Sequence, residues 1–416
     1  MMRKYFLKKT LVCGIIISFI CLVIAPNVNC EKIKTKSKNS DSEPFNPFLS
    51  GWFARKTVTI KHEKIQENLT DFPLLISVVD SDLAAKIQDD GDDILFMDSK
   101  GKANKLCHEI ELFNSSSGKL VVWVKIPHIS SSSDTKIEMY FRNSKCDNQQ
   151  EPADVWTTNY KGVWHMNSGT NNNQGDSTIN NHILSHYGSP TSVEGKIGYA
   201  VDLNGLSDYF TYPADTDFLM GAGSFTIAAW VKADNDAKDD DGRVIVYKGS
   251  DGPTHTHAYA FWNVRQGTGF SAITIDDNTV AKAVFGISDL SDGMWHYIVG
   301  ARDQDKIKIW VDGILEGSTY IGNYGSLDGA GRLYVGRGGI EARYLKGVLD
   351  DLIIIKGVAK SDGWIATSYN NQNDPSGFYT VSRESTKSYN ENYLGVLENL
   401  QSYLFRLPFI KHLFGV

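Results

Sequence analysis

Short runs of β-branched and aromatic residues recur through most of this chain, each bounded by Gly, Asp, Ser or Asn. Such runs are typical of strands in antiparallel sheets, because these side chains suit a half-buried pleated surface. The clearest include "KLVVWVKIP", "TKIEMYFRN", "SFTIAAWVKA", "MWHYIVGAR", "KIKIWVDG" and "GVLDDLIII". Asp312-Gly313, between "KIKIWV" and "ILEG", is a two-residue hairpin signal. No repeat of roughly 20–50 residues is evident, so the spacing predicts antiparallel sandwiches rather than a propeller or solenoid.

The composition is that of an ordinary globular protein and gives no sign of nucleic-acid binding. The chain has 416 residues, of which 41% are hydrophobic and 22% charged, with a formal net charge of -7. Nucleic-acid binders gather Lys and Arg in patches interleaved with aromatic residues, and the sequence has no such patch. The length allows two domains.

Residues 1–30 are predicted to be a signal peptide or an N-terminal anchor. Basic residues, including Lys8 and Lys9, precede the uncharged stretch "LVCGIIISFICLVIA". This stretch suits a signal-peptide core and is shorter than the roughly 20 residues that span a bilayer. An uncleaved anchor is the alternative, because no A-x-A cleavage site follows. Either interpretation places the rest of the chain outside the cytoplasm, and the polar, Lys-rich residues 31–50 are expected to form a flexible linker.

The last segment, residues 383–416, differs in kind from the strand runs. Its apolar residues recur at helical spacing and predict an amphipathic helix that Pro408 kinks or ends; they are Tyr393, Val396, Leu397, Leu400, Leu404 and Leu407. Two roles are open for this helix. It packs on its own sandwich, or it attaches the protein to a membrane surface or a partner.

Motifs in a fixed order resemble two known families. The first set is "KIGYAVDLNGLSDYFTYP", "GSFTIAAWVKA", "LYVGRG" and "LKGVLDDLIII", and it resembles a LamG-like domain, a concanavalin A-like lectin/glucanase jelly roll, at 156–360. Upstream, "RKTVTIKHEKI", "DDGDDILFMDSKG" and "VWTTNYKGVWHMN" resemble a domain of unknown function at 51–155. That family precedes LamG-like domains in archaeal and bacterial surface proteins, and its closing signature recurs at 361–382 in "WIATSYNNQNDPSGFYTV". The resemblance implies an all-β prokaryotic surface protein of two antiparallel sandwiches, the second a jelly roll, followed by a C-terminal amphipathic helix.

The sequence does not favour an enzyme. Glycoside hydrolysis needs two carboxylates flanking the scissile bond, and laminarinase-type jelly rolls carry theirs in an E-x-D-x-x-E run that this chain lacks. The nearest approach is "HEIEL", whose Glu109 and Glu111 we interpret as solvated strand carboxylates. The G-x-S-x-G and H-E-x-x-H motifs are also absent.

Aromatic residues on polar strand faces are the candidates for ligand binding. Strand alternation in "KIKIWVD" places Trp310 with charged residues, opposite the aliphatic residues Ile307 and Ile309. A ring on a charged face is a candidate platform for stacking on a sugar, and a structural role on the second sheet is the alternative. "AYAFWN" offers Trp262 and Asn263 with the same two interpretations.

Calcium is the cofactor that the resemblance implies, because jelly rolls of this class often carry a calcium ion at a sheet edge. Asp350 in "GVLDDLIII" falls where the resemblance puts a family acid, and Asp202 in "YAVDLNG" is the second candidate. Carboxylate oxygens are the ligands that calcium prefers. Turn capping by both acids is the alternative.

Cys107 and Cys146 are the only cysteines outside the leader and its edge. An exported protein tolerates disulfides, so we expect the two to be bonded to each other. Two separate buried thiols are the alternative.

The sequence therefore predicts a non-catalytic, extracellular or cell-surface protein of an archaeon or bacterium. Its LamG-like domain is expected to bind a glycan or a protein partner. A structural or adhesive spacer with tail-mediated association to a partner or membrane is the alternative. A glycoside hydrolase with unrecognised acids is the least favoured function.

Overall fold

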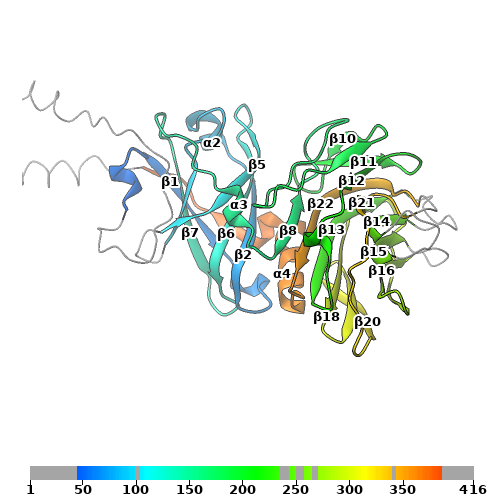
Figure 1. Cartoon of the computed structure of the whole chain (residues 1–416). Coiled ribbons are helices and arrows are strands. Elements are labelled where there is room, and N and C mark those ends of the chain that lie inside the picture. The colour runs from blue at the N-terminus through cyan, green and yellow to red at the C-terminus, as the bar shows by residue number, and fades with distance from the viewer. Residues whose placement is uncertain are drawn as a thin grey trace, which may run out of the picture.

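The computed structural model describes residues 45–99, 104–234, 243–249, 257–264, 270–339 and 343–386. The predicted leader and the predicted tail helix lie outside these residues. The described chain forms two β-sandwiches side by side, as expected, with a helix between them (Figure 1). We call them the first sandwich and the jelly roll.

The first sandwich packs two antiparallel sheets against each other. One sheet has the order β23 (Tyr379–Val381), β1 (Ala54–Ile60), β7 (Thr135–Phe141), β3 (Leu95–Asp98) and β4 (Lys105–Leu106), with β24 (Ser385–Thr386) also paired to β1. The other has the order β2 (Leu69–Val79), β6 (Lys119–Ile129) and β5 (His108–Asn114). Short helical turns connect the strands: η1 (Pro47–Leu49), η2 (His62–Lys64), α2 (Ser81–Lys86) and α3 (Pro152–Val155).

The jelly roll also has two sheets. We call the sheet nearer the first sandwich the docked sheet. Its strand order is β10 (Thr191–Glu194), β11 (Tyr199–Asn204), β22 (Lys346–Lys356), β13 (Phe225–Ala233), β18 (His296–Asp303), β19 (Lys306–Val311) and β20 (Ile314–Tyr320). A further strand, β8 (Tyr160–Trp164), pairs with β22. The distal sheet has the order β17 (Ala281–Asp289), β16 (Phe270–Asp276), β15 (His257–Val264), β14 (Arg243–Gly249), β21 (Arg332–Val335), β12 (Tyr209–Tyr212) and β9 (Ser185–Tyr187). The turn η3 (Thr216–Phe218) follows β12.

The docked sheet is buried on both faces, which explains why β13 and β22 are apolar almost throughout. One face shares a core with the distal sheet, including Ile227, Ile309 and Ile354. The opposite face, which carries Trp230 and Trp310, belongs to the same hydrophobic core as the first sandwich. The alternation predicted for "KIKIWVD" is therefore confirmed, because Ile309 and Trp310 lie in different cores.

The closing segment returns to the first sandwich after the jelly roll is complete. It forms α4 (Asp362–Asn373), α5 (Pro375–Phe378), β23 and β24. Val381 of β23 pairs with Val58, and Thr386 of β24 pairs with Ala54. The jelly roll is thus inserted within the first sandwich, and both ends of the described chain lie at one sheet of that sandwich.

Helix α4 lies between the two sandwiches and binds both of them through side chains (Figure 1). The Asn371 amide pairs with the peptide groups of Leu75 in β2: its Oδ1 accepts from N (2.8 Å) and its Nδ2 donates to O (2.9 Å). On the other side, Gln372 Oε1 accepts a hydrogen bond from Trp230 Nε1 (2.6 Å). Ser361 caps the helix by accepting from Trp364 N (3.1 Å).

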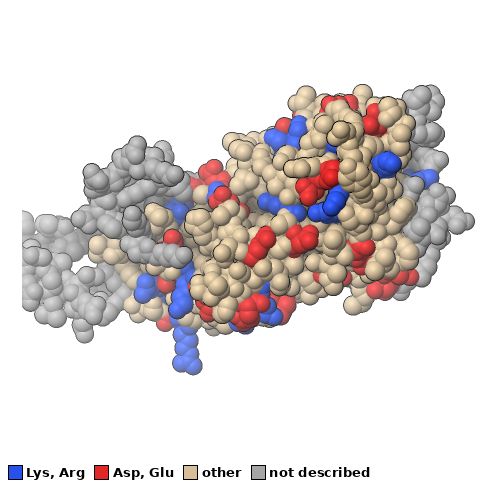
Figure 2. Space-filling model, turned by 90° about the horizontal axis from the view of Figure 1, so that it is seen from below, with Lys and Arg blue, Asp and Glu red and all other residues tan. Residues whose placement is uncertain are grey.

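Among the described residues, no helix combines the length and apolar character needed to cross a membrane. The face seen in Figure 2 intersperses Lys and Arg with Asp and Glu rather than gathering one sign of charge.

Replacing Asn371 with Leu is expected to destabilise the protein by about 2–4 kcal/mol, because the N–H and C=O groups of Leu75 lose their partners in a buried place. Asn373→Leu is the control on the same helix and should cost much less, since Asn373 is exposed and loses only the surface hydrogen bond from Lys196 Nζ (2.7 Å). Urea unfolding followed by tryptophan fluorescence measures both. Equal stability of the two variants would show that α4 does not hold the sandwiches together.

Candidate functional site

Trp310 does not form the sugar platform that the sequence predicted. Its side chain is 1% exposed and lies under α4, where its Nε1 donates to Asp362 Oδ1 (3.2 Å). The Lys308 ammonium lies 5.9 Å from the ring centroid. The ring is buried in the interface between the sandwiches, so the structural alternative describes it.

Asp202 and Asp350 do not fit one calcium ion. Asp202 pairs with Val348, so Asp350 is its diagonal neighbour across the strand pair. Neither carboxylate belongs to a group of three or more potential metal ligands among the described residues. Asp350 is moreover fully buried, with its Oδ2 accepting from Ile197 N (2.9 Å), whereas Asp202 is exposed. Calcium binding elsewhere in the jelly roll stays a prediction.

Cys107 and Cys146 are not bonded to each other, which corrects the predicted disulfide. They belong to separate hydrophobic clusters, Cys107 to the main core of the first sandwich and Cys146 to a small cluster around Trp52. Burial raises the pKa of the Cys107 thiol to about 11, so it stays protonated and unreactive at neutral pH.

Trp262 lies on the outer face of the distal sheet, within a row of aromatic side chains. The row crosses five neighbouring strands, and we call it the aromatic row; it consists of Tyr187, Tyr209, Tyr334, Tyr247 and Trp262. Tyr187 and Tyr209 stack with centroids 4.8 Å apart and planes 6° apart. The predicted partner Asn263 is 1% exposed, so its amide does not lie on the open surface with the ring of Tyr187.

Arginine side chains cover parts of the aromatic row. The Arg337 guanidinium lies 5.2 Å from the centroid of Tyr209 and 5.0 Å from that of Tyr334, while Arg343 lies 5.3 Å from that of Trp262. Tyr187 is 47% exposed at one end of the row, whereas Tyr334, Trp262 and Tyr247 are buried, with 4%, 5% and 8% of their surface exposed. The Tyr187 end of this face thus combines an exposed flat ring with planar N–H donors.

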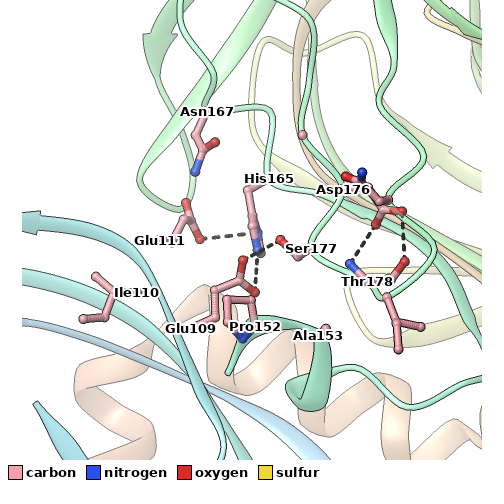
Figure 3. Close-up of a pocket in the computed structure, with 13 residues that line it drawn as sticks. Glu109, Ile110, Glu111, Pro152, Ala153, His165, Asn167, Asp176, Ser177 and Thr178 are labelled. Carbon is pink, nitrogen blue, oxygen red and sulfur yellow. Dashed lines mark hydrogen bonds and ion pairs between the residues drawn. The ribbon is translucent and has the colours of Figure 1, made fainter. Parts of the chain in front are cut away.

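A second polar constellation lies between the two sandwiches, and sequence reasoning missed it. Glu109 and Glu111 of β5 meet His165, which follows β8 (Figure 3). Asp351 of β22 also pairs with His165. We call these residues and Asp350 the interdomain cluster. An open cavity of about 540 Å³ adjoins it, lined in part by Glu109, Glu111 and His165.

Two β-bulges bring the acids of the cluster together. In β22 the register with β13 shifts beside Asp351, whose φ of 44° is left-handed, so Asp350 and Asp351 both turn toward the first sandwich. In β5 the register with β6 shifts at Glu111. The β10–β11 turn closes over the cluster, where a Cβ on Gly198 would lie 2.3 Å from Glu111 Oε1.

His165 is held by carboxylates at both ring nitrogens. Its Nδ1 lies 2.6 Å from Asp351 Oδ1 and 3.5 Å from Glu111 Oε2, and its Nε2 lies 3.4 Å from Glu109 Oε2. The ring also stacks on Trp123, with centroids 5.8 Å apart. Burial alone would lower the pKa of His165, but Glu109, Glu111 and Asp351 raise it well above its ordinary value.

The carboxyl groups of the cluster differ in protonation. Burial, together with Asp351, raises the pKa of Glu111 to about 8, and burial with Asp351 and Glu111 raises that of Asp350 well above its ordinary value. Burial acts on Glu109 too, but the charge of His165 and hydrogen bonds from His165, Ser177 and Trp156 outweigh it and lower its pKa. At neutral pH the cluster therefore contains a His165–Glu109 ion pair beside a protonated Glu111.

Two carboxyl groups with pKa values moved in opposite directions are the pattern of a glycosidase acid and base. Here Glu109 Oε2 accepts from Trp156 Nε1 (2.8 Å) and its Oε1 accepts from Ser177 Oγ. The Glu111 side chain has no exposed surface. Because Glu109 is hydrogen-bonded at both oxygens and Glu111 is buried beneath the jelly roll, the cluster fits a joint between sandwiches better than an acid–base pair.

The interpretation of Glu109 and Glu111 as solvated carboxylates is thus wrong, because the jelly roll covers them. The motif "HEIEL" was the sequence signal that could have revealed these buried acids. It places two glutamates, separated by one apolar residue, in a strand whose other residues contribute to a core. Their partner His165, in "VWHMN", is distant in sequence and gave no pattern.

Comparisons with known proteins agree with this architecture. Residues 204–366 match the concanavalin A-like lectin/glucanases superfamily, and residues 90–177 match a domain of unknown function, DUF2341. Both domains were expected from the sequence, in this order. No curated protein matches the chain.

Solved structures show distant similarity. The binding domain of Paraclostridial Mosquitocidal Protein 1 has a TM-score of 0.41 at 14% identity, covering 51% of this chain and 52% of its own. The receptor binding domain of botulinum neurotoxin C/D mosaic serotype gives 0.41 at 15%, covering 51% of each chain. Domain 4 of AbnA, an extracellular arabinanase from Geobacillus stearothermophilus solved with arabinotriose, gives 0.39 at 18%, covering 51% of this chain and 98% of its own. This chain thus spans about half the length of the two toxin domains, and similarity at this level carries no functional argument.

Stability is expected to fall as pH rises from about 5 to 9, because the folded state holds protons on Glu111 and His165 that the unfolded chain releases. The Glu111 contribution is full below its ordinary pKa of 4.5 and is lost as pH rises through about 8. His165, with its raised pKa, acts in the same direction. Glu111→Gln keeps an acceptor for Trp123 and should reduce this fall in stability, seen as a smaller drop in melting temperature between these pH values.

Glu194→Gln, on an exposed residue of β10, is the control and should behave as the unaltered chain. An unchanged pH profile in Glu111→Gln would contradict the assignment of a raised pKa to Glu111.

Proposed function

We propose that this is a non-catalytic, exported surface protein that binds a glycan on the outer face of the distal sheet. The aromatic row with its arginines is the observation that carries the proposal. Sugar rings present flat C–H faces, which stack on tyrosine and tryptophan, and hydroxyl groups, which accept from guanidinium N–H groups. The match to a superfamily of lectins and glucanases supports a carbohydrate ligand over a nucleic acid.

The layer order supports presentation of this face to the surroundings. The first sandwich, the docked sheet and the distal sheet follow one another, since one core joins the first two and a second core joins the last two. Both ends of the described chain lie on the first sandwich, as the pairing of Ala54 with Thr386 shows. A leader or tail attached to the cell surface would therefore leave the distal sheet facing away from it.

A spacer or adhesive module is the second candidate, and the shared core between the sandwiches favours it. Two domains fixed by α4 would hold a partner at a set distance from the surface. In that case the tail, rather than the aromatic row, would make the specific contact.

Tyr187→Ala is expected to weaken glycan binding by roughly tenfold, because it removes the most exposed ring of the aromatic row. Tyr320→Ala is the matched control, since Tyr320 is 68% exposed but lies on β20 of the docked sheet. A glycan array probed with the full chain identifies a ligand, and titration calorimetry then compares the variants.

A blank array with the folded chain would favour the spacer. Binding that Tyr320→Ala weakens as much as Tyr187→Ala would move the site away from the aromatic row. Hydrolysis of laminarin or a similar polymer would contradict the non-catalytic assignment.

A further inference from the structure

His182, Asp215 and Asp217 meet at one end of the distal sheet, and none of the three belongs to the aromatic row or the interdomain cluster. His182 lies just before β9, and the two aspartates flank the first residue of η3. The His182 side chain is 5% exposed, and the rings of Tyr212 and Phe218 pack against it with centroids 4.8 Å away in each case. The aspartate side chains are 32% and 30% exposed, which leaves one side of the group open to solvent.

Each of the three side chains has one polar atom held by the protein and a second that faces the common centre. His182 Nδ1 donates to the Lys161 carbonyl (2.7 Å), which leaves Nε2 as the free lone pair of the neutral ring. Asp215 Oδ1 accepts from Asp217 N (2.8 Å), and Asp217 Oδ1 is paired with Lys161 Nζ (3.2 Å). The remaining atoms are His182 Nε2, Asp215 Oδ2 and Asp217 Oδ2.

The three free atoms are spaced as metal ligands would be. His182 Nε2 lies 3.5 Å from Asp217 Oδ2 and 3.8 Å from Asp215 Oδ2, and the whole set lies within 4.8 Å. Ligands bound tetrahedrally at about 2.0–2.1 Å lie about 3.3–3.4 Å apart, so the two distances from His182 would need to shorten by only a few tenths of an ångström. Both distances are too long for hydrogen bonds.

Two other histidines of the described chain form ion pairs with carboxylates, and their contacts differ from those of His182. His296 has Nδ1 2.8 Å from Asp312 Oδ2 and Nε2 3.2 Å from Asp292 Oδ1, so carboxylates engage both nitrogens. His165 is held by carboxylates at both nitrogens as well. In His182 the backbone carbonyl takes Nδ1 instead, which is the arrangement that orients metal-binding histidines in proteins.

Two further charges lie near the group. Lys161 Nζ offsets part of the charge of Asp217, and Asp176 Oδ2 lies 3.8 Å from His182 Nδ1. Asp176 is committed to backbone N–H groups, accepting at Oδ1 from Val163 N (3.0 Å) and at Oδ2 from His182 N (2.8 Å).

We propose that His182, Asp215 and Asp217 bind a divalent transition-metal ion of the zinc type. One imidazole and two carboxylates are a donor set that suits such an ion, whereas calcium prefers oxygen alone. The open side leaves a fourth position for water or for an oxygen of a ligand. The site is independent of the proposed glycan surface.

Zinc chloride titrated into metal-stripped full chain is expected to bind at this site and to raise the melting temperature. His182→Ala should weaken this binding at least tenfold. Asp217→Asn should also weaken it, and because that side chain is partly exposed, the variant remains informative if His182→Ala folds poorly. His296→Ala is the matched control and should bind zinc as the unaltered chain does.

Competition with a chromophoric chelator measures the affinity, and circular dichroism confirms that each variant is folded. Absence of zinc binding in the unaltered chain would overturn the proposal, as would unchanged zinc binding in folded His182→Ala and Asp217→Asn. Stabilisation by calcium equal to that by zinc would overturn the assigned class of metal.

Discussion

The pairing of the Asn371 side chain with the N–H and C=O groups of Leu75 holds helix α4 against the first sandwich, and the position of α4 determines which faces of the protein are open to a ligand. This pairing ties α4 to the edge of β2 with two hydrogen bonds, in the way a neighbouring strand would. On the opposite side of the helix, Gln372 and Trp230 tie it to the docked sheet. Because α4 needs Trp230 and Trp310 for its own packing, these large rings of the docked sheet are unavailable to a ligand. Within the aromatic row of the distal sheet, Tyr187 is the most exposed ring.

The interdomain cluster adds a second, electrostatic joint to this interface. Buried carboxyl groups are costly unless a proton or a positive charge compensates them. His165 supplies the charge for Glu109 and Asp351, and Glu111 remains neutral at ordinary pH. From these pKa shifts we expect the joint to weaken as Glu111 and His165 lose their protons in alkali.

The strands, their faces and the two domains could be predicted from the sequence, because they depend on local patterns. Asp312 and Gly313, for example, take the positive φ values, 50° and 78°, of the turn that their dipeptide signalled. The site could be predicted only in part. Trp262 belongs to the aromatic row but is buried, and the exposed ring of that row, Tyr187, comes from a strand far away in sequence. Trp310 was assigned to the correct face, yet the sequence of its strand does not reveal that α4 covers that face.

Two further features depended on tertiary structure that no local pattern encodes. The bulges at Glu111 and Asp351 set which way the acids point, and they arise from pairing with distant strands. The lone pair on His182 Nε2 depends on the hydrogen bond from Nδ1 to the Lys161 carbonyl, and Lys161 is 21 residues away in sequence.

The central claim is that the inserted jelly roll and the first sandwich form one cooperative unit. Scanning calorimetry of the chain near pH 6 tests it most directly, because a shared core predicts a single transition whose calorimetric and van't Hoff enthalpies agree. Two separate transitions, one for each sandwich, would contradict the claim.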